Sequence, residues 1–105
     1  MKRTVFFVSE STGITAEALG HSLLSQFEGV DFERVYMPFI NTELRAKALL
    51  DLIQEAADRD GARPIIFSTM LDDRVREVIK SGTGYFLELF EIFMDPISQE
   101  LGIPP

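Results

Sequence analysis

Small polar residues gather in one short run, residues 9–15, that is suited to binding an anion. The run follows an apolar stretch at residues 4–8 and precedes a helical pattern, so it is expected to open a helix. Hydroxyl groups and the free backbone N–H groups of a helix start bind phosphate or carboxylate. The residues concerned are Ser9, Ser11, Thr12, Gly13 and Thr15. The same residue types also shape turns and cap helices without binding any ligand, and this alternative stays open.

A second polar cluster, Ser68, Thr69 and Asp72, follows another apolar stretch and is a further candidate for the same site. The adjacent pair Asp72 and Asp73 is of a type that holds Mg²⁺ or transfers protons. Capping is the more common role of an aspartate that precedes a helical pattern. We therefore expect Asp72 or Asp73 to be a helix N-cap, and we predict no metal site.

Two residues on the helix that follows the first run, Glu17 and His21, are candidates for proton transfer. Histidine changes its charge near neutral pH, and a glutamate four residues earlier on a helix lies within reach of it. His21 is about 200° around the helix from Leu19, so it is expected to point away from the apolar stripe. A solvated surface histidine is the alternative. Together with Ser11 and Thr12, these two residues make up the catalytic candidates.

Apolar runs with strand character alternate with helical stripes along the whole chain. The runs at residues 4–8, 32–39, 64–69 and 85–90 are rich in β-branched and aromatic residues and predict four strands. The first stripe predicts a helix that Thr12 or Thr15 caps and that Glu28-Gly29 ends. Its core positions are expected to be Ala16, Leu19, Gly20, Leu23, Leu24 and Phe27.

The later helices have start and stop residues of their own. Asn41 or Thr42 is expected to begin the second helix and Asp60-Gly61 to end it, while Ser81-Gly82 ends the third. Asp95-Pro96 is typical of a helix start, because proline suits the first helical position, and Gly102 ends this last helix.

One carboxylate, Glu88, interrupts the last apolar run. A buried carboxylate without a partner is costly. Glu88 therefore predicts that its strand lies at the edge of the sheet or at an interface.

The repeated strand-helix order predicts a three-layer, doubly wound α/β domain over residues 1–105. Right-handed crossovers leave few arrangements, and we predict a four-stranded, mainly parallel sheet in the order 2-1-3-4 with about four helices. Ligands of such sheets bind beyond the carboxyl ends of the strands. With the first and third strands as neighbours, the run at 9–15 faces the cluster at 68–72.

Composition excludes several classes of function. The 10 Lys and Arg residues against 17 Asp and Glu give a net charge of −7 without a basic cluster, which argues against nucleic acid and anionic membranes as partners. With no Cys and one His, disulfides, thiolate catalysis and Cys- or His-rich metal sites are excluded. The absence of Cys fits a cytoplasmic protein. Neither a G-x-x-x-x-G-K-[ST] loop nor a G-x-G-x-x-G turn follows a strand, so no nucleotide phosphate loop or bound cofactor is predicted.

The strand, loop and helix at residues 5–21 resemble the opening of a bacterial regulatory family. The motif Ser-(Asp/Glu)-Ser-Thr-Gly-x-Thr-Ala-Glu occupies residues 9–17, and Leu19-Gly20-His21 continues it. It is similar to the motif of the phosphoenolpyruvate synthetase regulatory proteins and the related pyruvate, phosphate dikinase regulatory proteins. Glu10 stands where many members have Asp, which keeps the charge and changes its reach. Further matches are Met37-Pro38-Phe39, Arg63-Pro64 and Asp95-Pro96-Ile97 to Leu101.

The resemblance covers the whole chain but only the front of the family's proteins, which are more than twice as long. It implies the N-terminal domain of a bifunctional serine/threonine kinase and pyrophosphorylase. Such an enzyme uses ADP to phosphorylate a threonine of its target, and it removes that phosphate with inorganic phosphate, releasing pyrophosphate. The implied target is phosphoenolpyruvate synthetase, with pyruvate, phosphate dikinase as the alternative.

The family's nucleotide phosphate loop lies in its C-terminal part, and no residue of this chain matches it. The chain alone is therefore expected to be inactive. Its expected partners are the target enzyme, its own C-terminal domain and a second copy in a homodimer. The remaining alternative is a stand-alone anion-binding or protein-interaction module without catalysis.

Overall fold

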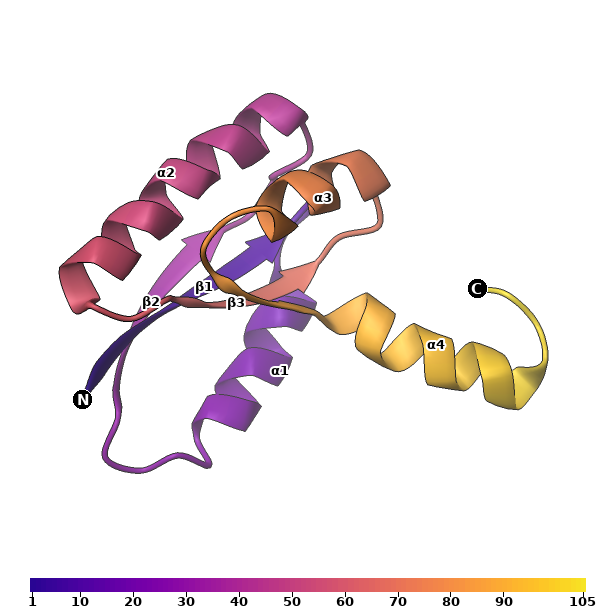
Figure 1. The fold of residues 1–105 in the computed structure, drawn as a ribbon. Coiled ribbons are helices and arrows are strands. Elements are labelled where there is room, and N and C mark those ends of the chain that lie inside the picture. Colours follow the sequence, from indigo (N-terminus) through magenta and orange to yellow (C-terminus); the bar gives the residue numbers. More distant parts are fainter.

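The strand β1 (Lys2–Ser9) lies inside a four-stranded sheet, and the computed structural model describes the whole chain, residues 1–105 (Figure 1). A continuous β-branched and aromatic run suits this place, because both faces of a parallel sheet are covered. Val5, Phe6, Phe7 and Val8 are at most 2% exposed. The other elements are α1 (Ile14–Leu24), β2 (Asp31–Met37), α2 (Glu43–Asp60), β3 (Ile65–Thr69), α3 (Asp73–Lys80), β4 (Tyr85–Glu88) and α4 (Leu89–Leu101).

All four strands are parallel, and they lie in the order β2-β1-β3-β4. The predicted fold class and strand order are therefore confirmed. β1 pairs with β2 along its length and with β3 from Val5 onward, which places Ser9 beside Thr69 at the carboxyl end. β4 is an edge strand, as predicted, but Glu88 is buried with hydrogen-bond partners and not exposed at the edge.

The helices cover the two faces of the sheet unequally. α2 and α3 pack on one face, and α1 packs on the other (Figure 1). The larger core cluster joins Phe6 of β1 to Leu49 of α2 and Ile79 of α3. The smaller cluster joins Phe7 of β1 to Leu24 of α1. The side chains of β1 thus alternate between two separate cores.

α2 and α3 begin and end where the sequence predicts. The hydroxyl of Thr42 accepts the N–H of Arg45 at 3.1 Å, and Gly61 ends α2 in the left-handed conformation. Asp72 caps α3, and Ser81 follows its last residue. None of the four helices combines the length and the apolar character that a membrane crossing needs.

α1 is shorter than predicted, and its buried line is narrower. The helix ends at Leu24, where the hydroxyl of Ser25 donates to the carbonyl of Ser22 at 2.7 Å and the following N–H groups bond three residues back. The expectation that Leu23 and Phe27 belong to the core is wrong, since they are 43% and 64% exposed. The buried line of α1 is instead Ala16, Gly20 and Leu24.

Gly20 brings α1 unusually close to the sheet. A Cβ at this position would lie 2.3 Å from Cε1 of Phe7 and 3.1 Å from Cδ2 of Phe67. No real side chain tolerates the shorter distance, so the ring of Phe7 occupies the place that a methyl group would need. The glycine therefore sets the spacing between α1 and the two central strands.

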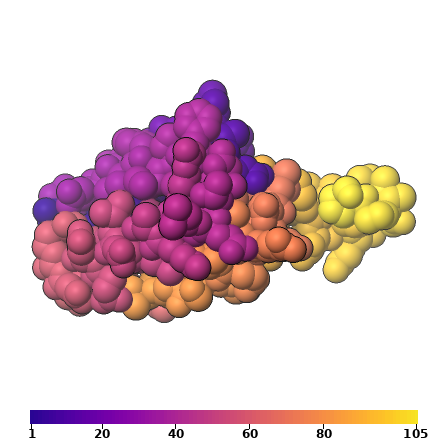
Figure 2. Space-filling view, turned by 90° about the horizontal axis from the view of Figure 1, so that it is seen from above, coloured from indigo at the N-terminus to yellow at the C-terminus, as the bar shows by residue number.

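α4 also begins earlier than predicted. β4 ends at Glu88, whose carboxylate accepts the N–H of Phe90 at 3.1 Å and caps the new helix. Asp95 is therefore not the helix start, and Pro96 lies within the helix. α4 projects from the body of the molecule (Figures 1 and 2). Its outer residues, among them Phe93 and Ile97, are more than half exposed.

The two neighbouring leucines of α1 test this account of the core. Leu24→Ala is expected to lower the free energy of unfolding by about 2–5 kcal/mol, because it leaves a cavity under the helix. Leu23→Ala is expected to cost less than about 1 kcal/mol, because Leu23 already faces solvent. Urea unfolding of both variants measures the difference. Equal losses would mean that the orientation of α1 described here is wrong.

Candidate functional site

A polar pocket of about 160 Å³ lies at the carboxyl edge of the sheet. Residues 9–15 line one side of it, and Thr69, Leu71 and Phe90 line the other. The pocket thus joins the end of β1, the start of α1, the turn after β3 and the start of α4. Parallel sheets bind their ligands at this edge.

Backbone hydrogen bonds hold the loop after β1 in a defined shape. The hydroxyl of Ser9 accepts the N–H of Ser11 at 3.1 Å. The carbonyls of Ser9 and Ser11 accept the N–H groups of Ile40 and Phe39 at 2.8 and 2.9 Å. The loop after β2 therefore supports the loop after β1 from the side.

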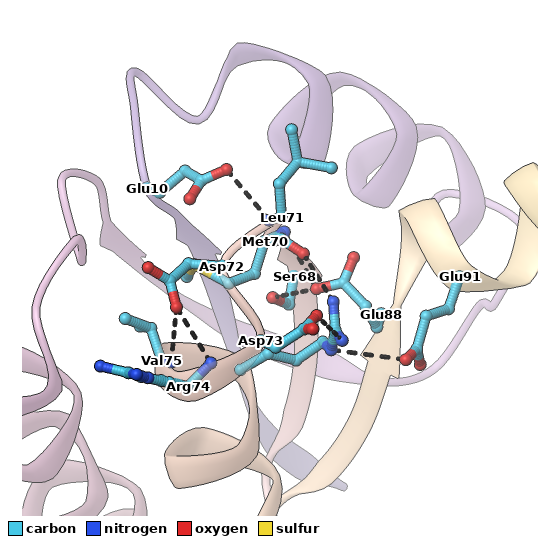
Figure 3. A network of polar contacts seen from close by, with 11 residues as sticks. Glu10, Ser68, Met70, Leu71, Asp72, Asp73, Arg74, Val75, Glu88 and Glu91 are labelled. Carbon is cyan, nitrogen blue, oxygen red and sulfur yellow. Dashed lines mark hydrogen bonds and ion pairs between the residues drawn. The ribbon is translucent and has the colours of Figure 1, made fainter. Parts of the chain in front are cut away.

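Glu10 ties the same loop to the turn after β3. Its Oε1 accepts the N–H of Leu71 at 3.0 Å (Figure 3). A hydrogen bond from an N–H to a carboxylate is stronger than one between neutral groups, and Glu10 also lines the pocket. Glu10 is thus part of the wall of the pocket.

α1 begins at Gly13 without a side-chain cap. Gly13 has a φ of 84°, and no side chain accepts the first N–H groups of the helix. The expectation that Thr12 or Thr15 caps α1 is wrong, because the left-handed turn places a glycine at the N-cap position. The first N–H groups of a helix have no acceptor within it. In α1 these N–H groups belong to the first residues of the helix, of which Ile14 and Thr15 line the pocket.

Glu17 lies directly above this turn. A Cβ at Gly13 would come within 3.4 Å of Oε2 of Glu17 and 3.7 Å of Cβ of Ser9. Of the four catalytic candidates, Ser11 and Thr12 line the pocket and Glu17 lies beside it. These are ordinary contact distances, so the φ of 84° and not a lack of space is what favours glycine at position 13.

The second polar cluster is divided by the structure. Thr69 lines the pocket. Ser68 points the other way, and its hydroxyl donates to Oε1 of Glu88 at 2.8 Å. Asp72 accepts the N–H groups of Arg74 and Val75 as the cap of α3 (Figure 3).

Glu88 is the polar centre that the sequence did not mark as part of the site. Its side chain is buried and accepts hydrogen bonds from Ser68 Oγ and from Met70 N–H at 3.0 Å (Figure 3). It also accepts one from the N–H of Phe90. Burial raises the pKa of Glu88, and these hydrogen bonds offset part of the rise. The sequence did contain a sign of this role, namely a single carboxylate at the end of an otherwise apolar strand.

Arg76 connects this centre to α3 and α4. It forms ion pairs with Asp73 and, at 3.4 Å, with Glu91 of α4. Its guanidinium also donates to the carbonyl of Met70 at 3.3 Å. The side chain of Arg76 is only 16% exposed, so it is held between α3 and α4 and does not face solvent.

His21 lies apart from the pocket. Nε of Arg34 donates to its Nδ1 at 3.0 Å, and the hydroxyl of Tyr36 lies 3.2 Å from its Nε2. Its ring packs 4.9 Å from that of Phe7. The expectation that Glu17 is the partner of His21 is wrong, because residues of β2 supply the polar contacts of the ring. The ring is half-buried rather than solvated, since α1 lies so close to the sheet.

Comparison with known proteins assigns the family. A family model described as Kinase/pyrophosphorylase matches residues 5–105. The chain belongs to this family.

Curated relatives agree with this assignment. A protein of Thiocapsa roseopersicina is 70% identical over all 105 residues, which are 39% of that protein. Proteins of Marinobacter nauticus and of Pseudomonas aeruginosa strain LESB58 are each 48% identical over 101 residues, which are 96% of this chain and 37% of theirs. All three are named "putative phosphoenolpyruvate synthase regulatory protein". The chain thus spans well under half the length of these relatives.

The raised pKa of Glu88 predicts a pH-dependent stability. Between the ordinary value of 4.5 and the raised pKa, the folded state binds more protons than the unfolded state. The free energy of unfolding therefore falls as pH rises through this window. Glu88→Gln has no proton to lose there, so its curve is expected to lack this component.

Urea unfolding between pH 4 and about 8 measures the effect. As pH rises, the free energy of unfolding of the wild-type chain is expected to fall relative to that of Glu88→Gln. Glu91→Gln is the control, because Glu91 is exposed and its variant keeps the wild-type slope. Parallel curves for the wild type and Glu88→Gln would contradict the assignment.

Proposed function

We propose that the pocket at the carboxyl edge holds the phosphoryl group that is exchanged between a nucleotide and a threonine of phosphoenolpyruvate synthase. In this proposal the full-length protein uses ADP to phosphorylate and inactivate the synthase. It then uses inorganic phosphate to restore the free threonine. Membership of the kinase/pyrophosphorylase family and the names of the relatives support this reading.

One observation carries the proposal: the N-terminus of α1 is open toward a pocket lined by hydroxyl groups. Side chains of Thr42, Asp72 and Glu88 cap the other three helices. At α1 the free N–H groups and the partial positive charge of the helix end are left for a ligand. A phosphoryl group satisfies both, and Ser11 and Thr12 add hydroxyl donors.

The forward reaction requires a proton acceptor. The threonine oxygen of the target forms a bond to the β-phosphorus of ADP, the bond from that phosphorus to the bridging oxygen breaks, and AMP leaves. The proton of the threonine hydroxyl must pass to a base. We assign this role to Glu17, the carboxylate that lies over the Gly13 turn.

Removal of the phosphoryl group is a second transfer, to inorganic phosphate, and it uses the same groups. An oxygen of inorganic phosphate attacks the phosphorus of phosphothreonine, pyrophosphate forms, and the threonine oxygen takes up a proton. The hydroxyls and N–H groups of the pocket would hold the transferred phosphoryl group in both directions.

ADP itself would be held outside these residues, because the chain has no glycine-rich phosphate loop. The purified chain is therefore expected to form no phosphothreonine on phosphoenolpyruvate synthase in the presence of ADP. Phosphothreonine detection by mass spectrometry measures this. Phosphorylation by the chain alone would place the nucleotide site within residues 1–105 and overturn the division of roles.

Two threonines provide a matched test of the pocket. It uses a chimera in which this chain replaces the matching part of the Thiocapsa roseopersicina protein. Thr12→Ala is expected to reduce transfer in both directions about 100-fold, because it removes a hydroxyl donor. It should change the free energy of unfolding by less than about 0.5 kcal/mol, because Thr12 is exposed and caps no helix.

Thr42→Ala is the control and should behave in the opposite way. It removes the cap of α2, so it should lower the free energy of unfolding by about 0.5–2 kcal/mol and leave transfer intact. Normal transfer by the Thr12→Ala chimera would show that the loop is only a turn and does not bind the phosphoryl group. Transfer to pyruvate, phosphate dikinase but not to the synthase would keep the chemistry and change the target.

A further inference from the structure

An apolar groove lies at the opposite end of the sheet from the pocket. It is an open cavity of about 420 Å³ on the α1 side, and ten of its eleven lining residues are apolar. Leu23, Leu24 and Phe27 form one wall, and Phe67, Tyr85 and Leu87 form the other. The groove is therefore bounded by the end of α1 and by the strands β3 and β4.

The groove exists because one half of this face has no helix. α2 and α3 both cover the opposite face, whereas this face has α1 and, from α4, only the first residue Leu89 in its core cluster (Figure 1). α1 ends at Leu24, so the amino ends of β3 and β4 have no cover. Leu23, Phe27 and Tyr85 are each at least 43% exposed in consequence. An apolar surface of this kind on a doubly wound sheet marks an interaction site.

The groove also has a defined charge. Arg3 is the single charged residue of the lining, and its Nη2 donates to the carbonyl of Arg63 at 2.7 Å. Nε of Arg3 is buried and has no hydrogen-bond partner. The guanidinium of Arg63 lies 4.7 Å from the ring centre of Tyr85, at the edge of the same groove. The side chain of Arg3 as a whole is partly exposed, so an occupant that brings a carboxylate to its guanidinium would form a charge-assisted hydrogen bond.

We propose that this groove is the docking surface for the part of the full-length family protein that lies outside these residues. The docking segment is apolar and carries a carboxylate that faces Arg3. The relatives supply the length for it, because the matched region is only 37–39% of each of them. The groove and the pocket lie at opposite edges of the sheet, so docking leaves the pocket accessible. This inference does not depend on the reaction proposed above.

Cysteine labelling tests the proposal, since the chain has no cysteine of its own. Leu23→Cys and Tyr85→Cys place single thiols on the two walls of the groove. Lys47→Cys on the exposed face of α2 is the matched control. Each is introduced into the chimera with the Thiocapsa roseopersicina protein. The rate of maleimide labelling at the new cysteine is followed by peptide mass spectrometry and compared with the rate in the urea-denatured chimera.

Both groove cysteines are expected to react at least about tenfold more slowly than the control, because the docked segment covers them. In this chain without a partner the replaced side chains are well exposed. Labelling as fast as at the control position would overturn the proposal. Protection that disappears on dilution from about 100 to about 1 μM would also overturn it, because it would show that a second copy fills the groove.

Arg3→Met tests the carboxylate contact. In the Leu23→Cys chimera it is expected to raise the labelling rate at least about threefold, because the segment loses its ionic partner. Arg3→Lys keeps the charge and is expected to retain most of the protection. Equal protection with Met and with the native Arg3 would overturn the proposed carboxylate. All of these readouts are independent of phosphotransfer, so failure of the proposed function leaves them interpretable.

Discussion

The structure depends on the burial of β1 on both faces. Four consecutive apolar residues, Val5 to Val8, alternate between the two cores and are almost without solvent exposure. This can be satisfied only if β1 has a strand on each side and a helix layer on each face. The register that results sets Ser9 beside Thr69. The polar pocket thus forms where the apolar part of β1 ends and the polar residues after β1 and β3 meet.

Two carboxylates then fix the edge of the sheet. The turn after β3 presents two successive N–H groups, those of Met70 and Leu71, to Glu88 and to Glu10 respectively. One carboxylate comes from β4 and the other from the loop after β1, so the turn is held from both sides (Figure 3). Both carboxylates are thus engaged with backbone donors. The unoccupied donors are those at the start of α1, where no side chain caps the helix.

The general fold could be predicted because it follows from patterns that are local. Alternating strand-like and helix-like runs predicted the parallel sheet and its order, and hydroxyl or carboxylate caps predicted the starts of α2 and α3. The predictions were wrong where the structure is determined by a contact between residues that are distant in the sequence. Leu23 had the right spacing for the core, but the close approach of Gly20 to Phe7 turned the buried line away from it.

The site was predictable in position but not in its connections. The loop after β1 was recognisable from its residue types, and it does line a pocket. The caps of α1 and α4 were not, because Gly13 replaced a hydroxyl at one and Glu88 reached forward from a strand at the other. His21 was paired with its neighbour on the helix, whereas its partners Arg34 and Tyr36 come from β2. The apolar groove leaves no local pattern, since it results from a helix that stops early.

The glycine at position 20 has a geometric consequence for the whole molecule. α1 is an 11-residue rod, about 16 Å long, whose middle packs closely on the rings of Phe7 and Phe67 at Gly20. One end of the rod forms a wall of the polar pocket, and the other end forms a wall of the apolar groove. A short helix moves as one rigid body, so a shift of α1 that reshapes one cavity also reshapes the other.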